Sequence, residues 1–354
     1  MEYQQLGNTG VFVSRLCLGA MTFGGKGGIF EVIGGLPQHD VQTLVDDSIE
    51  AGVNFFDTAN VYSAGESETM LGKALGQRRK DVVIASKVFG RMGPGANQVG
   101  LSRLHIFNEV EASLQRLGTD YIDLYQIHGF DALTPFEETL GALTDLVRQG
   151  KVRYIGCSNL TAWQIMKSLG ISAQGHLEKF VTLQAYYSLA GRELEREIGP
   201  MLLDQKMGLL VWSPLAGGFL SGKFTRTGGA SDAESRRSKF TFPPVNLEKG
   251  YDIVDVLTAV AARKEATVAQ VALAWLLHQP CVTSVIIGAK KASQLKDNLG
   301  AVNVKLDAED LKQINDASAL SPEYPGWMLA TQGGDRRPGQ VRDWSRFTAA
   351  AAKK

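Results

Sequence analysis

The sequence has few cysteines, no net charge and no long apolar run. Its three cysteines, Cys17, Cys157 and Cys281, lie far apart, in a spacing that matches neither a metal site nor a disulfide framework. Basic and acidic residues both number 37 among 354, which gives no broad field for nucleic acid or an anionic membrane. No apolar stretch reaches membrane-spanning length, and the first residues lack a signal-peptide pattern. We therefore expect a cytoplasmic protein with reduced thiols, no metal, and no nucleic-acid or membrane partner.

What is present is a regular alternation of strand-like and helical segments. A hairpin is expected around the turn at residues 7–10, and helical patterns such as 108–117 and 136–149 are each followed by a glycine. The expected strands span residues 15–19, 54–57, 82–87, 122–128, 152–158, 181–185, 208–213 and 283–288. Eight strands separated by helices close a barrel. We expect residues 1–354 to form a single (β/α)₈ TIM barrel, with a doubly wound parallel sheet as the alternative.

Three segments are longer than a minimal barrel needs. They span residues 24–38, residues 214–250 and a tail from about residue 321, which follows an expected C-terminal helix. Long loops in a compact domain usually serve as lids or binding loops. We expect the tail to cover the substrate pocket.

Polar side chains stand at the ends of three successive expected strands. Asp57 ends the second strand, Lys87 the third and His128 the fourth, and Tyr62 follows Asp57 by five residues. The carboxyl ends of barrel strands form the catalytic face. Each residue alone is compatible with a purely structural role, but four of them in adjacent units indicate an active site.

The chemistry of these four side chains suits proton transfer at a carbonyl or alcohol oxygen. A phenol has an ordinary pKa of about 10, and a neighbouring lysine ammonium lowers it by favouring the phenolate. A carboxylate keeps that lysine charged, and a histidine can orient a substrate carbonyl. No reductant is among them, so a bound hydride carrier has to supply it.

These residues and several further motifs resemble the aldo-keto reductase superfamily. The Asp, Tyr, Lys and His tetrad of that family matches Asp57, Tyr62, Lys87 and His128 in order and approximate spacing. The resemblance covers residues 3–320 and includes motifs at 19–24, 156–159, 184–186, 212–218 and 286–291. It implies reversible reduction of an aldehyde or ketone with NADPH/NADP+, NADH being a second possibility, and with Tyr62 as general acid and base.

The resemblance also implies how the dinucleotide is held, extended across the barrel mouth. Ser158, Asn159 and Gln184 would hold the nicotinamide carboxamide, and the ring of Tyr186 or of Trp212 would stack on the nicotinamide. Ser213, Leu215 and Gly217, with Lys223, would line the pyrophosphate. The adjacent lysines Lys290 and Lys291 would receive the 2′-phosphate, which favours NADPH over NADH. The expected cofactor residues are Gly19, Met21, Ser158, Asn159, Gln184, Tyr186, Trp212, Ser213, Leu215, Gly217, Lys223, Gly288, Lys290, Lys291, Gln294 and Asn298.

Aromatic residues in the loops and tail are expected to wall the substrate pocket, namely Phe23, Phe89, Phe130, Tyr324 and Trp327. The sequence leaves open which carbonyl or alcohol is the substrate, and whether the protein is a monomer or a small homo-oligomer. A second hypothesis is a nicotinamide-dinucleotide-binding regulatory or redox-sensing subunit, because the family contains channel-associated members that keep the tetrad. A third is a barrel enzyme that acts on a phosphate-bearing substrate.

Overall fold

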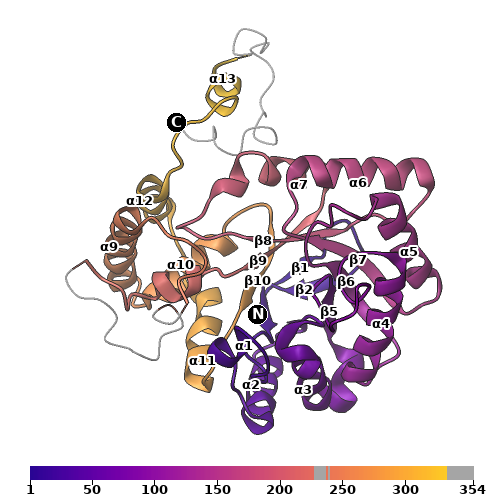
Figure 1. Ribbon diagram of the computed structural model, residues 1–354. Helices are drawn as coiled ribbons and strands as arrows, with labels where there is room; N and C mark the ends of the chain where they lie inside the picture. The colour runs from indigo at the N-terminus through magenta and orange to yellow at the C-terminus, as the bar shows by residue number, and fades with distance from the viewer. Residues whose placement is uncertain (227–236, 238–239, 333–354) are drawn as a thin grey trace.

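In a computed structural model of the protein, which describes residues 1–226, 237 and 240–332, parallel strands close into a barrel (Figure 1). The barrel strands are β3 (Leu16–Gly19), β4 (Phe55–Asp57), β5 (Val83–Val88), β6 (Ile122–Ile127), β7 (Val152–Ser158), β8 (Thr182–Tyr186), β9 (Gly208–Trp212) and β10 (Val282–Ile287). They pair in chain order, and β10 closes the ring by pairing with both β9 and β3. The predicted barrel is confirmed, and the doubly wound sheet is wrong.

The expected N-terminal hairpin is present and closes the amino-terminal end of the barrel. It consists of β1 (Tyr3–Gln5) and β2 (Phe12–Ser14), paired antiparallel. A Cβ atom on Gly7, in the turn, would lie 2.2 Å from the carbonyl oxygen of Val181, which directly precedes β8. Leu6 and Val13 of the hairpin join a buried cluster with residues from the interior of the barrel. The carboxyl ends of the strands are therefore the open end for chemistry.

Helices surround the barrel and bury its outer face in one large apolar core (Figure 1). They include α2 (Gln38–Glu50), α3 (Glu66–Leu75), α4 (Arg103–Leu117), α5 (Phe136–Arg148), α6 (Ala162–Gly175), α7 (Ile198–Gln205), α9 (Leu247–Arg263), α10 (Val268–Leu277), α11 (Ala292–Leu299) and α12 (Ala308–Ser318). The helix expected at 108–117 begins earlier, at Arg103, because the Ser102 hydroxyl accepts a hydrogen bond from the N–H of His105 and caps it. Among the described helices, none has the length and apolar character needed to cross a membrane.

The three long segments have different structures. Residues 24–38 contain the short helix α1 (Phe30–Ile33) and fold back through a bridge between Phe23 and Leu36. Residues 214–250 contain the 3₁₀ helix η4 (Ala216–Ser221) and the start of α9, while 227–236 and 238–239 lie outside the described residues. The expected C-terminal helix is α12.

The tail contains a short helix. Helix α13 (Gly326–Thr331) is exposed along its whole length and stands away from the barrel (Figure 1), while residues 333–354 lie outside the described part of the chain. The rings of Tyr324 and Trp327 pack on each other, with centroids 6.2 Å apart, and the tail is anchored at its base by an ion pair between Arg196 and Glu323. Helix α13 therefore stands apart from the barrel, and the expected cover over the substrate pocket stays a prediction.

Candidate active site

The four side chains singled out in the sequence meet at the carboxyl ends of β4, β5 and β6. The Lys87 Nζ atom donates hydrogen bonds to Asp57 Oδ1 at 2.6 Å, to the Thr58 carbonyl at 2.8 Å and to Tyr62 Oη at 3.2 Å. His128 lies edge-on to Tyr62, with ring centroids 5.7 Å apart and an interplanar angle of 73°. The ammonium is thus fixed between a carboxylate and a phenol, with an imidazole beside that phenol's ring.

Strand register produces this meeting point. Asp57 is the last residue of β4, and the pairing of β5 with β6 sets Lys87 opposite Gln126. His128 is the first residue beyond β6, and its backbone N–H continues the ladder by donating to the Val88 carbonyl at 2.9 Å. Because neighbouring parallel strands end at the same rim, these side chains are brought together by the barrel itself.

Tyr62 begins a tight turn, the 3₁₀ segment η1 (Tyr62–Gly65). Ser63 and Ala64 both have left-handed backbone angles, with φ of 51° and 54°, and Gly65 follows with φ of 90°. Non-glycine residues with left-handed backbone angles are uncommon, and the strain of each costs about 1–3 kcal/mol. They persist where surrounding contacts enforce them. The turn returns the chain at once into α3 and leaves the Tyr62 ring beside Lys87 and His128.

Lys87 is fully buried, yet its pKa is raised. Burial by itself would lower the pKa, because the ammonium loses its hydration. The negative charge of Asp57, that of an ionised Tyr62 and the hydrogen bonds to both groups outweigh this effect. Lys87 therefore stays protonated and favours the phenolate form of the neighbouring phenol.

Burial, and then the positive charge of Lys87, lower the pKa of His128 to about 3. The imidazole is therefore neutral at physiological pH. One ring nitrogen carries a hydrogen and the other a lone pair. His128 can donate a hydrogen bond to a carbonyl oxygen without bringing a second positive charge.

The second oxygen of Asp57 is held by two amides. Gln184 Nε2 donates to Asp57 Oδ2 at 2.7 Å, and Gln126 Nε2 at 3.4 Å. This occupies one of the two N–H donors of Gln184, so its other N–H and its carbonyl oxygen remain for the carboxamide that the resemblance assigns to it. Sequence reasoning missed Gln126, although a glutamine two residues before His128 in an apolar strand lies on the same strand face and was a usable signal.

Ser158, at the end of β7, has a buried hydroxyl with no hydrogen-bond partner among the described residues. Such a group costs about 1–3 kcal/mol when it is left unsatisfied. The neighbouring Asn159 has both polar atoms engaged, because its Nδ2 donates to the His128 carbonyl at 3.1 Å and its Oδ1 accepts from Trp212 Nε1 at 3.0 Å. A ligand amide, which both donates and accepts, fits the free hydroxyl of Ser158.

Both rings expected to stack on the nicotinamide belong to one aromatic group. Tyr186 and Trp212 have ring centroids 5.1 Å apart, and Trp212 stacks on Phe242 at 5.8 Å with an interplanar angle of 13°. The Tyr186 hydroxyl shares a hydrogen bond of 2.9 Å with Ser188. A Cβ atom on Gly191 would lie 2.2 Å from the Tyr186 ring, so the glycine permits this ring position.

The segment expected to hold the pyrophosphate follows β9. Ser213 has a left-handed backbone, and its Oγ accepts a hydrogen bond of 3.0 Å from the N–H of Gly217. Gly217 has φ of 67°, and a Cβ there would lie 2.7 Å from the Phe242 carbonyl. Leu215 is half-buried and Lys223 is exposed. The backbone is thus tightly folded where phosphate oxygens are expected.

The other end of the expected dinucleotide site is formed by β3, β10 and α11. Gly19 and Gly288 stand at the carboxyl ends of the adjacent strands β3 and β10, and Met21 is half-buried close by. A Cβ on Gly19 would lie 2.7 Å from the Ile286 side chain. Gly288 is exposed at this rim, so its backbone is accessible to a ligand, whereas Gly19 is buried.

Lys290 and Lys291 are exposed and directly precede α11. The Gln294 side chain accepts a hydrogen bond of 2.9 Å from the N–H of Lys290, and the mostly buried Asn298 donates to the Gly288 carbonyl at 3.4 Å. Two cations at a helix N-terminus suit a phosphate group.

The five aromatic residues expected to wall the substrate pocket do not form one wall. Phe23 is fully buried in the core, so its assignment is wrong for this structure. Tyr324 and Trp327 are exposed residues of the tail. Phe89 is half-buried, and Phe130 is an exposed residue of the loop after β6.

Sequence reasoning missed Phe30. Its ring centroid lies 5.7 Å from that of Tyr62. It comes from α1, inside the glycine-rich segment after β3. An aromatic residue within a long loop that follows a catalytic-face strand end was the available signal.

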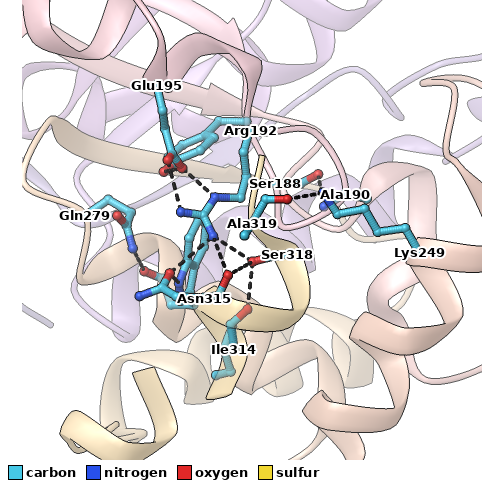
Figure 2. Close-up of polar contacts among 12 residues, drawn as sticks. Ser188, Ala190, Arg192, Glu195, Lys249, Gln279, Ile314, Asn315, Ser318 and Ala319 are labelled. Carbon is cyan, nitrogen blue, oxygen red and sulfur yellow. Dashed lines mark hydrogen bonds and ion pairs between the residues drawn. The ribbon is translucent and has the colours of Figure 1, made fainter. Parts of the chain in front are cut away.

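Arg192 connects the loop after β8 to the base of the tail (Figure 2). It pairs with Glu195 through two hydrogen bonds of 2.7 and 3.0 Å, and on its other side donates to Ser318 Oγ of α12 at 2.7 Å. Its guanidinium also lies over the ring of Trp275, 4.9 Å from the centroid. The loop that contains Ser188, the partner of Tyr186, is thereby fixed to the C-terminal helix.

Comparisons with known proteins agree along nearly the whole barrel. A family model described as "Aldo/keto reductase family" matches residues 15–319. The "Uncharacterized oxidoreductase YrpG" of Bacillus subtilis (strain 168) is 39% identical over 342 residues, 92% of this chain and 100% of the relative. The "Versiconal hemiacetal acetate reductase" of Aspergillus parasiticus is 34% identical, over 92% of this chain and 99% of its own length. The "Probable voltage-gated potassium channel subunit beta" of Arabidopsis thaliana is 38% identical, over 86% of this chain and 92% of its own length.

Proposed function

The chain belongs to the aldo/keto reductase family, and on that premise we propose that it is an NADPH-dependent enzyme that reversibly reduces an aldehyde or ketone to an alcohol. The observation that carries the proposal is the position of Lys87 Nζ, 2.6 Å from Asp57 Oδ1 and 3.2 Å from Tyr62 Oη. A phenol beside a buried cation can give its proton to a carbonyl oxygen and recover one from an alcohol.

Each residue of the tetrad has a separate task in this reaction. Tyr62 moves the proton at its Oη atom, and Lys87 stabilises the phenolate that remains. Asp57 keeps Lys87 charged and in place, and its own position is held by amide hydrogen bonds. The neutral His128 donates a hydrogen bond that orients the substrate carbonyl. When bound, NADPH supplies the hydride that the protein lacks.

The residues present fit a nicotinamide dinucleotide. The unpaired hydroxyl of Ser158 supports a carboxamide contact, and the aromatic group of Tyr186 and Trp212 supports stacking on the nicotinamide. Lys290 and Lys291 before α11 favour NADPH over NADH, because only NADPH carries the extra phosphate. The remaining residues that would hold the dinucleotide are Gly19, Met21, Asn159, Gln184, Ser213, Leu215, Gly217, Lys223, Gly288, Gln294 and Asn298.

Steady-state assays on a panel of carbonyls and alcohols, each with NADPH and with NADH, test the proposal. We expect turnover with aldehydes or ketones and a preference for NADPH. Tyr62→Phe should lower kcat by about 10²-fold or more, because proton transfer in the transition state is lost, while the Kd for NADPH changes little. Turnover of the variant within a few-fold of wild type would remove Tyr62 from the acid role.

A second candidate function is that of a dinucleotide-binding regulatory or redox-sensing subunit. The similarity to the Arabidopsis protein named as a potassium channel beta subunit favours it. The same panel separates the two candidates, since a regulatory subunit binds NADPH with negligible turnover.

We further propose that the protein is cytoplasmic, because Cys17, Cys157 and Cys281 are all free thiols, as suits a reducing compartment. We also propose that it is a monomer or a small homo-oligomer. Light scattering measures the assembly.

A further inference from the structure

A buried ion pair that the proposed mechanism does not use lies behind the turn that carries Tyr62. It joins Glu68 of α3 to Arg116 of α4, two helices that pack side by side (Figure 1). The Arg116 Nε atom lies 2.6 Å from Glu68 Oε2, and the Glu68 side chain has no exposed surface. Buried carboxylates are rare unless they are paired, so we expect this ion pair to have a specific structural role.

Glu68 connects this pair to the strand that carries Lys87. Its Oε1 atom accepts a hydrogen bond of 2.5 Å from the hydroxyl of Ser86, which directly precedes Lys87 in β5. The two oxygens of one carboxylate therefore tie α3 to β5 and to α4 at once.

Arg116 reaches the other end of the same region, the turn itself. A Cβ atom on Gly65 would lie 2.6 Å from Arg116 Cδ, so the arginine stem packs directly on the left-handed end of the turn. Its guanidinium also lies 3.7 Å from Glu109, and Glu109 accepts a hydrogen bond of 2.9 Å from Asn60 Nδ2. The segment from Asn60 to Gly65, with Tyr62 in its middle, is thus held near both ends by contacts that converge on Arg116.

The backbone closes this arrangement. The N–H of Asn60 donates to the carbonyl of Lys87 at 3.2 Å. The left-handed angles of Ser63 and Ala64 need enforcement by surrounding contacts. The ion pair packs against the end of this turn at Gly65, through groups that do not belong to the tetrad.

We propose that Glu68 and Arg116 are positioning residues, which hold the Tyr62 turn and the Lys87 strand in the relative position that proton transfer requires. The proposal rests on the proposed carbonyl reductase function. A shift of about 1 Å between catalytic groups can lower a rate by about 10²-fold. Loss of the ion pair between Glu68 and Arg116, which we call the clamp, should therefore lower kcat. Binding of NADPH, whose expected contacts lie on or after β3 and β7 to β10 and in α11, should be little affected.

The experiment compares Arg116→Met with Arg79→Met as a matched control. Arg79 forms a comparably buried pair with Asp123, 2.8 Å apart, beside the amino-terminal ends of β5 and β6, remote from the catalytic rim. For each variant we would measure thermal stability, the Kd for NADPH, kcat and KM for a carbonyl, and hydrogen–deuterium exchange at residues 60–65. Arg116→Lys and the double variant Glu68→Gln/Arg116→Met complete the set, because the double variant removes the charge that a single substitution leaves buried and unpaired.

We expect Arg116→Met to lower kcat by about 10- to 100-fold, with the Kd for NADPH unchanged within about twofold and with faster exchange at residues 60–65. Arg116→Lys should recover part of kcat, and the double variant should fold but keep a low kcat. Arg79→Met should lose stability and keep kcat and exchange at wild-type levels. A wild-type kcat in either folded variant that lacks Arg116, or an equal loss of kcat in Arg79→Met, would overturn the proposal. A wild type without carbonyl turnover would contradict the proposed function instead, and exchange at residues 60–65 would still decide the clamp.

Discussion

Substituting Ser158 by Ala should raise the stability of the ligand-free protein while it weakens NADPH binding. The Ser158 hydroxyl is buried and has no hydrogen-bond partner among the described residues, so its removal deletes no hydrogen bond seen in the structure. The protein is relieved of the desolvation of an unsatisfied polar group. If that hydroxyl binds the nicotinamide carboxamide, the same substitution removes one hydrogen bond from the complex.

The two effects have opposite signs and similar sizes. Removing a buried, unsatisfied hydroxyl should stabilise the protein by about 1 kcal/mol, which corresponds to a rise in Tm of about 2 °C for a chain of this length. A hydrogen bond contributes about 0.5–1.5 kcal/mol net, so the Kd for NADPH should increase about 2- to 13-fold. The rise in Tm produced by a fixed NADPH concentration should shrink accordingly.

Ser48→Ala is the matched control. Ser48, on α2, is the same residue type, is also fully buried and also has a hydroxyl without a partner among the described residues. Its substitution should raise Tm by at least as much, since alanine also favours a helix by up to about 0.5 kcal/mol, and should leave the Kd for NADPH unchanged. Thermal melts and fluorescence titrations of the three proteins give all the values. A Ser158→Ala variant that melts lower than wild type, or binds NADPH as tightly, would refute the reasoning.

Three further predictions concern other parts of the site. The pKa of His128 is about 3 in the folded protein and about 6.5 in an unfolded chain, so the unfolded state binds more protons between these pH values. Urea titrations should therefore show a larger fall in the free energy of unfolding between pH 7 and pH 5 for wild type than for His128→Gln. Equal falls would contradict this. Arg192→Met should lower the free energy of unfolding, measured in urea, by about 3 kcal/mol. Arg196→Met should lower it by less than about 1 kcal/mol, because its ion pair with Glu323 is more exposed. Similar losses in the two variants would show that the contacts of Arg192 to Glu195 and α12 contribute little to stability. Replacing Lys290 and Lys291 by alanine should raise the Kd for NADPH about tenfold and leave that for NADH unchanged, whereas equal effects on both dinucleotides would place the 2′-phosphate elsewhere.

The fold and the meeting of the tetrad could be predicted because both follow from local patterns. Each barrel strand is an apolar run, and Asp57, Lys87 and His128 stand at or next to the ends of neighbouring runs. A barrel brings such ends to one rim whatever the helices between them do. Tyr62 needed only its short distance from Asp57 along the chain.

The pocket could not be predicted, because it depends on how loops pack. Phe23 looks like a loop aromatic in the sequence, but the bridge between Phe23 and Leu36 folds the segment back and buries it. The same folding brings Phe30 to Tyr62. The hydrogen bond from Gln184 to Asp57 is a long-range contact with no sequence pattern of its own.

The most direct test of the central claim uses NADPH that carries deuterium at the transferable position of its nicotinamide C4. With a carbonyl substrate found in the panel, the alcohol formed by wild type should carry one deuterium on the carbon that bore the carbonyl oxygen. Tyr62→Phe should form this labelled alcohol at least about 10²-fold more slowly. An alcohol without deuterium, or labelled alcohol formed by the variant at the wild-type rate, would contradict the account.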